Sequence, residues 1–265
     1  MKYTAENFHL HYIPQYQLLI KSDFTTDTLI VLDELQEVQV LYSYPSQTPD
    51  ADATKLLGLP FQDISISLPL QSFTLVPSEV YDSRHMAHYQ EFVQEEQMNR
   101  TQAESIEGLG VTGVFQFDLL LHRRWSAIFP QAKFLADFQV VLATAQRYLL
   151  AVGQVLGIHV KDKQVDLFVF QGKELQFYNI FDVEQLADLQ YFVLNVCNSL
   201  GLTGQFSQVL LSGVSAEHPF MAVAQRHGQT VQLMQPRVKL RSSDTEVQAF
   251  IRSLNLMADF RLCVS

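Results

Sequence analysis

Two histidines and a glutamate are spaced so that one helix could present all three to a metal ion. His85, His88 and Glu91 follow one another at three-residue steps, and side chains three apart lie on one face of a helix. Imidazole and carboxylate groups are common zinc ligands. Amphipathic helices often carry the same residue types on their solvent face, however. We therefore predict no metal site here, and we interpret the alternating His9 and His11 in the same way.

The sequence lacks the groupings that nucleophilic catalysis requires. The motif Gly-x-Ser-x-Gly is absent, and no serine, histidine and aspartate are grouped as a catalytic triad. The two cysteines, Cys197 and Cys263, are too few for a four-ligand zinc site or a disulfide framework. We expect both to be small, buried apolar residues in a reducing compartment.

The charge balance argues against nucleic acid as a partner. The net charge is -10 and the pI is near 5.2, so the field of the protein repels polyphosphate chains and anionic lipid surfaces. Arg123-Arg124, which precedes Trp125, is the only pair of adjacent Lys or Arg residues. We interpret the two arginines as exposed cations at a helix turn near a buried indole.

Length and composition predict a packed globular protein. The 265 residues are 48% apolar and 17% charged, enough for one core or for two coupled cores without disulfides or metals. No run reaches the roughly 18 uncharged apolar residues needed to cross a bilayer, and residues 1–7 lack the apolar core of a signal peptide. We expect a cytoplasmic protein without membrane insertion.

The elements that would position functional groups begin with a meander. Apolar and polar residues alternate in three short runs between residues 16 and 44, which predicts three antiparallel strands. A short helix over residues 53–57 and a strand over residues 63–68 follow, with residues 73–76 continuing that strand or pairing with it. A helix capped by Ser83 is predicted to run to about Met98, and a further strand covers residues 111–119.

The second part of the chain repeats this order. After a connecting helix over residues 138–152, strands at 155–160, 165–170 and 175–181 form a second meander, in which Val165, Leu167 and Val169 share one face. Three- and four-residue steps predict a helix with one buried seam, closed by Gly201; the seam residues are Leu186, Leu189, Val193, Val196 and Leu200. A strand at 209–211, a helix from Ser215 to Gly228, a strand at 230–234 and a helix at 245–258 complete the chain.

The shared order of meander, helix, strand, helix and strand predicts a duplicated architecture. We place the first half at residues 1–130 and the second, with the connecting helix, at residues 131–265. Because the two halves show no obvious sequence identity, we interpret the duplication as ancient or structural.

Two segments resemble one known family. The segment FYNIFDVEQLADLQYFVLNVCNSLGL, followed by QVLLSG, and the segment SISLPLQSFTLVPSEVYD are similar to a bacterial family called domain of unknown function 3822. The family has the actin-like ATPase (ribonuclease H-like) fold. The matching residues are Phe177, Asn179, Phe181, Asp188, Tyr191, Leu194, Leu211, Ser212 and Gly213, with Leu75, Pro77 and Tyr81 in the first half.

The resemblance implies an α/β fold of two ribonuclease H-like halves. Each half would be a mixed sheet with a three-stranded antiparallel meander and covering helices. The family brings no activity with it, and a likeness to the pilus-assembly scaffold proteins of the same superfamily is more distant.

Actin-like ATPases hold phosphates on a glycine-containing turn after the first strand of each half, because the backbone must approach the phosphate closely. The corresponding turns here, Lys21-Ser22-Asp23-Phe24 and Lys161-Asp162-Lys163-Gln164, contain no glycine. The turn that would lie against adenosine survives only as Ser212-Gly213-Val214-Ser215. We interpret Gly213 as a residue with positive φ and Ser215 as a helix cap. A divergent ATP and magnesium site would use Ser212, Gly213 and Ser215 together with Asp23 or Asp162.

Three aspartates suggest another chemistry of this fold, the two-metal chemistry of a nuclease. They are Asp166, Asp182 and Asp188. Asp166 precedes an apolar run, Asp182 is expected to cap a helix, and Asp188 lies within that helix. We therefore predict no catalytic cluster.

The sequence favours a non-catalytic interaction or scaffold module that binds an unknown protein partner. We predict no catalytic residue, no metal and no cofactor. The alternatives are a divergent ATP-binding protein or ATPase and, more distantly, a ribonuclease H-like nuclease.

Overall fold

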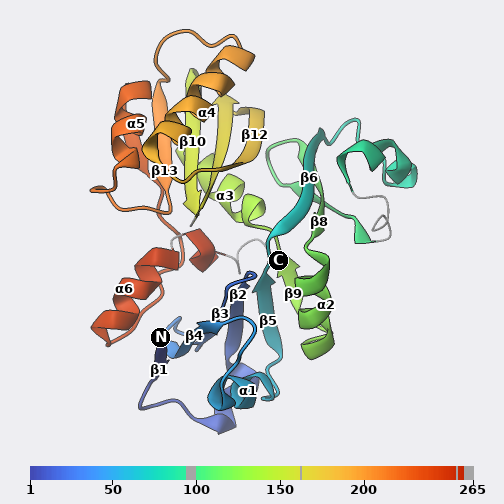
Figure 1. Ribbon diagram of the computed structural model, residues 1–265, viewed down its shortest axis with the longest axis vertical. Coiled ribbons are helices and arrows are strands. Elements are labelled where there is room, and N and C mark those ends of the chain that lie inside the picture. Colours follow the sequence, from blue (N-terminus) through green and yellow to red (C-terminus); the bar gives the residue numbers. More distant parts are fainter. Residues whose placement is uncertain (94–99, 162, 255, 260–265) are drawn as a thin grey trace.

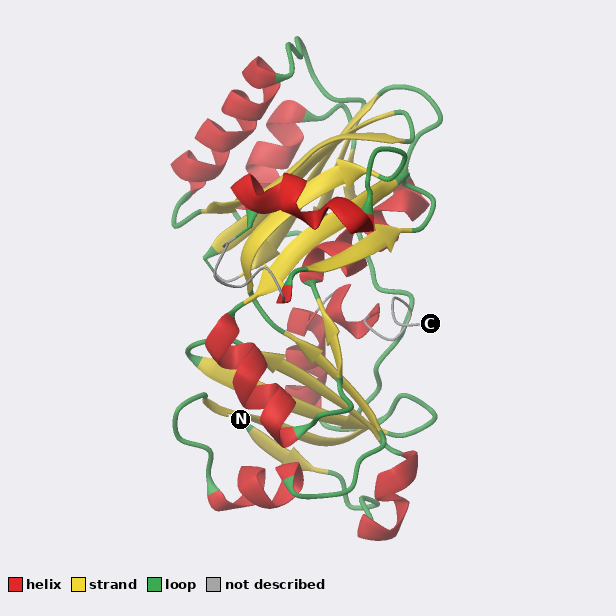
Figure 2. Cartoon of the chain, turned by 90° about the vertical axis from the view of Figure 1, so that its right-hand side faces the viewer, coloured by secondary structure: helices red, strands yellow, loops and turns green. Residues whose placement is uncertain are grey.

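The computed structural model describes residues 1–93, 100–161, 163–254 and 256–259. The chain forms two lobes, one above the other, each with a β-sheet and covering helices, and a third, smaller sheet lies beside them (Figure 1, Figure 2). No helix within these residues is both long enough and apolar enough to cross a membrane.

The first lobe is built on a sheet of six strands. Their order is β1 (Lys2–Thr4), β4 (Val38–Pro45), β3 (Thr26–Leu32), β2 (Gln17–Ser22), β5 (Asp63–Ser67) and β9 (Lys133–Leu135). Strands β2, β3 and β4 form the expected antiparallel meander, and β5 runs parallel to β2. The short elements η1 (Leu10–Gln15) and α1 (Ala51–Leu57) connect these strands.

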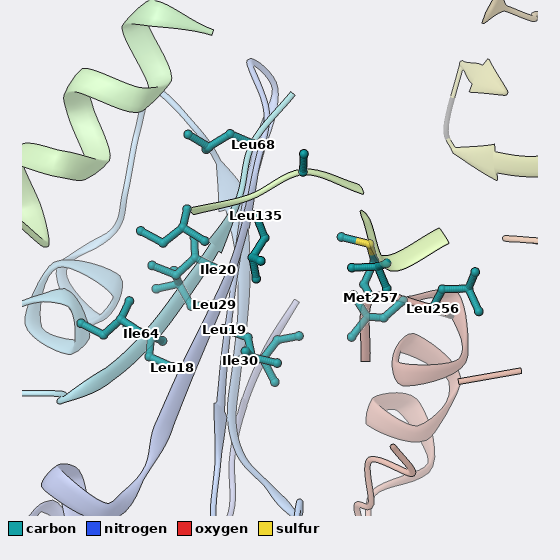
Figure 3. Close-up of a cluster of buried hydrophobic side chains, with 14 of the residues drawn as sticks. Leu18, Leu19, Ile20, Leu29, Ile30, Ile64, Leu68, Leu135, Leu256 and Met257 are labelled. Carbon is teal, nitrogen blue, oxygen red and sulfur yellow. The ribbon is translucent and has the colours of Figure 1, made fainter. Parts of the chain in front are cut away.

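Both faces of this sheet are buried, which explains its nearly continuous apolar strands. Figure 3 shows Leu18 and Ile20 on one face, while Leu19 and Ile30 lie on the face toward Met257. These five side chains belong to one core and are at most 7% exposed.

The second lobe repeats the strand order of the first. Its sheet runs β12 (Glu174–Asp182), β11 (Gln164–Gln171), β10 (Gln154–Lys161), β13 (Gln208–Ser212) and β14 (Val231–Leu233), which matches β4-β3-β2-β5-β9. Helices α4 (Leu186–Ser199) and α5 (Phe220–His227) cover one face. Helix α3 (Asp137–Ala145), followed by η4 (Gln146–Tyr148), contributes to the core on the other. The predicted fold of two mixed sheets, each with a meander, is confirmed.

The region between β5 and β9 differs from the prediction. Strands β6 (Leu70–Pro77), β8 (Val111–Phe117) and β7 (Gln102–Ile106) form a separate sheet instead of extending the first one. The helix predicted from Ser83 is a 3-10 segment, η2 (Ser83–Phe92), and residues 94–99 lie outside the described residues.

The helix that follows this inserted sheet was missed by sequence reasoning. It is α2 (Leu119–Ile128), and its N-cap Asp118 accepts hydrogen bonds from the backbone N–H groups of Leu120 and Leu121. The apolar run that continues from β8 into Leu119 concealed this cap, because alternation alone does not mark where a strand ends.

Two other predicted helices are shorter than expected. The connecting helix ends its α-helical part at Ala145, and Val152, where the predicted helix ended, is 83% exposed. The last helix, α6 (Thr245–Leu254), stops before Ala258. It returns to the first lobe, where Val247 and Leu254 join the core of the first sheet. The boundary between the halves near residue 130 stays a prediction.

The buried seam of α4 is largely as predicted. Leu189, Val193 and Val196 are at most 2% exposed and share a core with Val165, Leu167 and Val169. The expectation for Leu186 was wrong, because this side chain is 39% exposed. The expectation of two buried cysteines was also too strong: Cys197 is half-buried, and Cys263 lies outside the described residues.

Replacing Leu189 by alanine tests this packing. We expect Leu189→Ala to lower the free energy of unfolding by about 2–5 kcal/mol, since it removes fully buried methyl groups and leaves a cavity. Urea unfolding measures the effect. The matched control is Leu120→Ala on α2, where the side chain is 68% exposed and a change below about 0.5 kcal/mol is expected. Equal losses in the two variants would contradict the assignment of the buried face.

Candidate functional site

A charged cleft lies between the lobes, where the first strand of each meander, β2 or β10, ends. It contains a large groove of about 640 Å³ and a small cavity of about 310 Å³. Both are lined by Lys21 at the end of β2, Asp137 at the start of α3 and Lys161 at the end of β10. The groove is also lined by residues 22–25, 67–73 and 179–180, and the cavity by His159, Gly213, Val214, His218, Leu254 and Met257.

In the turn after β2, a carboxylate occupies two backbone donors. Asp23 Oδ1 accepts hydrogen bonds from the N–H groups of Thr25 at 2.6 Å and Thr26 at 2.7 Å, and from the Thr25 hydroxyl at 2.7 Å. Burial opposes ionisation of Asp23, but these hydrogen bonds outweigh it and hold the pKa of the carboxyl below its usual value. The chain therefore supplies its own anion to the N–H groups that a phosphate would need.

The guanidinium group of Arg124, on α2, contacts the two strands that flank this turn. The Arg124 guanidinium donates to Asp27 Oδ1 and to the hydroxyls of Ser22 and Ser46, at 2.7–2.8 Å. Our interpretation of Arg124 as an exposed cation was wrong: its side chain is 32% exposed and pairs with a buried carboxylate. The indole of Trp125 is buried, as expected.

Lys161 is the centre of an ion-pair network that joins the two lobes. Its Nζ lies 2.8 Å from Asp166 Oδ1 and 3.6 Å from Asp137 Oδ2. Asp137 Oδ1 accepts a hydrogen bond from the Ser67 hydroxyl of the first lobe, and Asp166 Oδ2 accepts one from the Tyr178 hydroxyl of the second. One ammonium group thus lies between carboxylates from two different parts of the chain.

Burial and pairing compete in setting the ionisation of this network. Burial alone would lower the pKa of Lys161, but the carboxylates of Asp166 and Asp137 outweigh it and raise that pKa. For Asp137, the nearby Lys161 and Lys21 outweigh burial and lower the pKa. Asp166 is fully buried, and there burial wins and raises the pKa despite Lys161.

His159 stays neutral beside these lysines. Burial, together with the ammonium groups of Lys161 and Lys21, lowers the pKa of this imidazole to about 3, and Asp137 offsets only part of the effect. Its Nδ1 lies 2.9 Å from the Ser212 hydroxyl, which is itself buried. Ser212, one of the candidate nucleotide ligands, is therefore already bonded within the protein.

The glycine of the third turn has a structural explanation. Gly213 has a φ of +83°, as predicted, and a β-carbon there would lie 1.9 Å from the carbonyl oxygen of Val160. Ser215 is exposed and does not cap α5, whose N-cap is Pro219. Asp162 lies outside the described residues.

These observations test whether ATP and magnesium fit the cleft. Asp23 occupies the N–H groups of Thr25 and Thr26, the hydroxyl of Ser212 is bonded to His159, and Lys161 is paired with the carboxylates of Asp166 and Asp137. Among the described residues, no three His, Cys, Asp or Glu side chains are grouped as metal ligands. The described residues of these turns do not fit ATP and magnesium.

The remaining candidate residues lie apart from one another. Asp182 does not cap α4 as expected but ends β12, where it accepts a hydrogen bond from Gln164. Asp188 is in the first turn of α4, and its carboxylate accepts from the N–H groups of Glu184 and Gln185. His85 and His88 stack on each other on η2, and the side chain of Glu91 is outside what the structure describes.

Sequence reasoning missed Lys21, Asp137, Lys161 and His159 as parts of one site. One signal was available: His159 and Asp166 are opposite each other in the β10–β11 hairpin, and both interrupt apolar strands. Polar residues facing one another inside a buried hairpin indicate a buried network. The contribution of Asp137 depends on tertiary packing and had no such signal.

Comparison with known proteins agrees with this architecture. The family described as "Protein of unknown function (DUF3822)" matches residues 5–226. The chain belongs to this family. No curated protein sequence matches it significantly.

Two solved structures share the fold of this DUF3822 protein. One is a Bacteroides thetaiotaomicron protein described as having an actin-like ATPase fold and unknown function. It is 16% identical, with a TM-score of 0.67 over 86% of this chain and 93% of that one. The other is a chain of the PilM-PilN type IV pilus biogenesis complex, 9% identical, with a TM-score of 0.59 over 94% and 98% of the two chains. At these identities the likeness establishes the fold alone.

Removing the ammonium group of Lys161 tests the network. We expect Lys161→Met to lower the free energy of unfolding by about 3–5 kcal/mol, because it leaves buried carboxylates without a counter-charge. The double variant Lys161→Met/Asp166→Asn should lose less than the single one. The control is Lys163→Met, an exposed neighbour, with a change below about 0.5 kcal/mol. Similar small effects of Lys161→Met and Lys163→Met in urea unfolding would refute the role of Lys161.

The neutral state of His159 predicts a pH dependence of stability. Its ordinary pKa is near 6.5 and its folded pKa is about 3, so the unfolded state binds the proton first. The contribution of His159 is therefore lost as the pH falls below 6.5. Between about pH 7 and pH 5 this loss is about 2 kcal/mol. His159→Gln removes the titrating group and retains a partner for Ser212, so urea unfolding should show a correspondingly smaller loss. Equal losses in both proteins would contradict a buried neutral imidazole.

Proposed function

We propose that this DUF3822 protein is a non-catalytic interaction or scaffold module of actin-like fold. The observation that carries the proposal is the turn after β2, where Asp23 occupies the N–H groups of Thr25 and Thr26. An anion site made of backbone donors depends on those donors being free. In this proposal the β2–β3 hairpin, whose equivalent binds phosphate in an ATPase, has only a structural role.

The Lys161 network supports the same proposal. In phosphoryl transfer, magnesium ions neutralise the charge that develops on the phosphates. Here a lysine of the chain itself neutralises the carboxylates of the cleft. With Lys161 as an internal cation, the protein keeps its two-lobed shape without the magnesium ion on which phosphoryl transfer depends.

A partner protein is favoured by two further observations. The PilM-PilN type IV pilus biogenesis complex contains a chain of this fold, aligned over almost its full length, and its description is of an assembly. In this chain the large groove is bordered by Phe24, 54% exposed at the tip of the β2–β3 turn, and by Pro69 and Leu70. Exposed aromatic residues beside a groove are typical of protein-binding surfaces.

Nucleotide binding is the direct test of this proposal. We expect no change in melting temperature when Mg-ATP or Mg-ADP is added at millimolar concentration, and no phosphate release. A ligand present at a hundred times its dissociation constant would stabilise the protein by about 2.7 kcal/mol, which is several degrees.

Asp23→Gly is the informative variant for this experiment, because it frees the N–H groups of Thr25 and Thr26. A shift seen only in this variant would confirm that the carboxylate closes the turn. A saturable shift in the wild-type protein would overturn the proposal in favour of a divergent ATP-binding protein.

A further inference from the structure

Helix α4 has an outer face that no described part of the chain covers. Its inner residues Leu189, Val193 and Val196 are buried against the second sheet. On the opposite side, Tyr191 is 64% exposed and Leu194 is 47% exposed. We call this surface the α4 face.

The α4 face carries no cationic group and no free carboxylate. The helix sequence LADLQYFVLNVCNS contains a single charged residue, Asp188. Its Oδ2 accepts hydrogen bonds from the backbone N–H groups of Glu184 and Gln185, which ties the carboxylate to the helix start. The outer side of a solvated helix ordinarily carries Lys, Glu or Arg, so this composition differs from that of a surface in contact with water alone.

An aromatic ladder continues the α4 face onto the edge strand β12. The rings of Phe177 and Phe181 stack at 6.4 Å, those of Phe181 and Phe192 at 4.4 Å, and Tyr191 meets Phe192 edge-on at 5.3 Å. The three phenylalanines are half-buried. The edge-on contact with Phe192 connects the exposed ring of Tyr191 to this ladder. Aromatic enrichment with charge depletion distinguishes the centre of a protein interface from ordinary surface.

The polar groups of the α4 face are amides, which suit contact with an identical surface. Asn195 and Asn198 are exposed on the same side of the helix as Tyr191. An amide both donates and accepts hydrogen bonds, so it can pair with its own copy, whereas a carboxylate or ammonium group would meet a like charge. In a symmetric dimer every group near the axis meets its own equivalent.

Charge also selects the partner. Each copy of the chain carries a net charge of -10, which opposes self-association through charged surfaces. An uncharged face avoids local like-charge contacts, and it offers no ionic group by which a differently charged partner would be recognised. We propose that a second copy of this chain covers the α4 face, with the two α4 helices and their aromatic ladders meeting across a twofold axis.

The size of the surface indicates a reversible dimer. A helix of 14 residues is about 21 Å long, and one helix with an adjacent strand edge corresponds to the small end of specific interfaces, near 1,000–1,200 Å² in total. We expect a dissociation constant in the micromolar range, at about 1–50 µM. This inference does not depend on whether the cleft binds a nucleotide.

Sedimentation equilibrium of the purified chain tests the proposal. The wild-type protein should be mainly dimeric at about 100 µM and dissociate on dilution. Tyr191→Glu/Leu194→Glu places two carboxylates on each copy of the α4 face and should weaken dimerisation at least tenfold. The matched control is Leu120→Glu/Val152→Glu, which adds the same charge at positions that are 68% and 83% exposed elsewhere. It should dimerise within about twofold of the wild type. All three proteins should have the same circular dichroism and melting temperature at low concentration, where each is monomeric.

Three results would overturn the proposal. The first is a wild-type protein that is monomeric at 200 µM, even if another protein is found on the α4 face. The second is a dimer that survives Tyr191→Glu/Leu194→Glu unchanged. The third is a dimer that both variants weaken equally, since that would reflect net charge and not this surface. If the double glutamate variant fails to fold, Tyr191→Ser/Leu194→Ser replaces it and should weaken the dimer in the same direction.

Discussion

The pairing of Lys161 with Asp166 and Asp137 is the interaction on which the arrangement of the lobes depends. Removing three charges from water costs several kcal/mol per ion, and the attraction between them offsets this only when the geometry is good and the remaining hydrogen-bonding groups are satisfied. Ser67 and Tyr178 supply the outer hydrogen bonds of the two carboxylates. Because Ser67 ends a strand of the first sheet and Lys161 one of the second, the network is complete only when the lobes are in this relative position.

The duplication places the two halves of this site in equivalent positions. Strand β2 of the first sheet corresponds to β10 of the second. Lys21 and Lys161 lie near the C-terminal ends of these two strands. The surroundings of the two lysines differ, however. Lys161 pairs with the buried Asp166, which lies on the neighbouring strand opposite His159, whereas the residue opposite Leu19 in the first meander is the apolar Ile30. The same backbone therefore produces a structural ion pair in one half and, in the other, a lysine that lines the cleft.

Much of the fold could be predicted from the sequence because its signals are local. Alternation defined both meanders, and three- and four-residue steps found the seam of Leu189, Val193 and Val196. The inserted sheet and α2 could not be separated in the same way, since the alternation of β8 continues past Asp118 to Leu119, the first residue of the helix. The chain's return to the first lobe in α6 was also missed. The sequence shows that this helix has an apolar face but not which sheet the face covers. Only the tertiary structure places Val247 in the core that contains the first sheet.

From the sequence, the candidate site could be recognised only by the lack of glycine in two turns. The ion-pair network of Lys161 could not be predicted. The lack of glycine in two turns indicates that the backbone there does not approach a phosphate closely. It does not show which groups of the protein lie in the place of the phosphate. The replacement comes from residues far apart in the chain. Asp137 begins a helix, Asp166 lies on a strand, and Arg124 reaches the first turn from a helix that was not predicted.

A ligand changes the relative position of two lobes only if it binds one arrangement more tightly than another. In this protein, opening the cleft would separate the Ser67 hydroxyl of the first lobe from Asp137, the carboxylate that pairs with Lys161. An external ligand would have to supply at least that lost interaction before any opening could occur. For a scaffold, this constraint is useful, since a partner then binds to surfaces whose spacing is already set and does not lose binding energy to ordering the lobes.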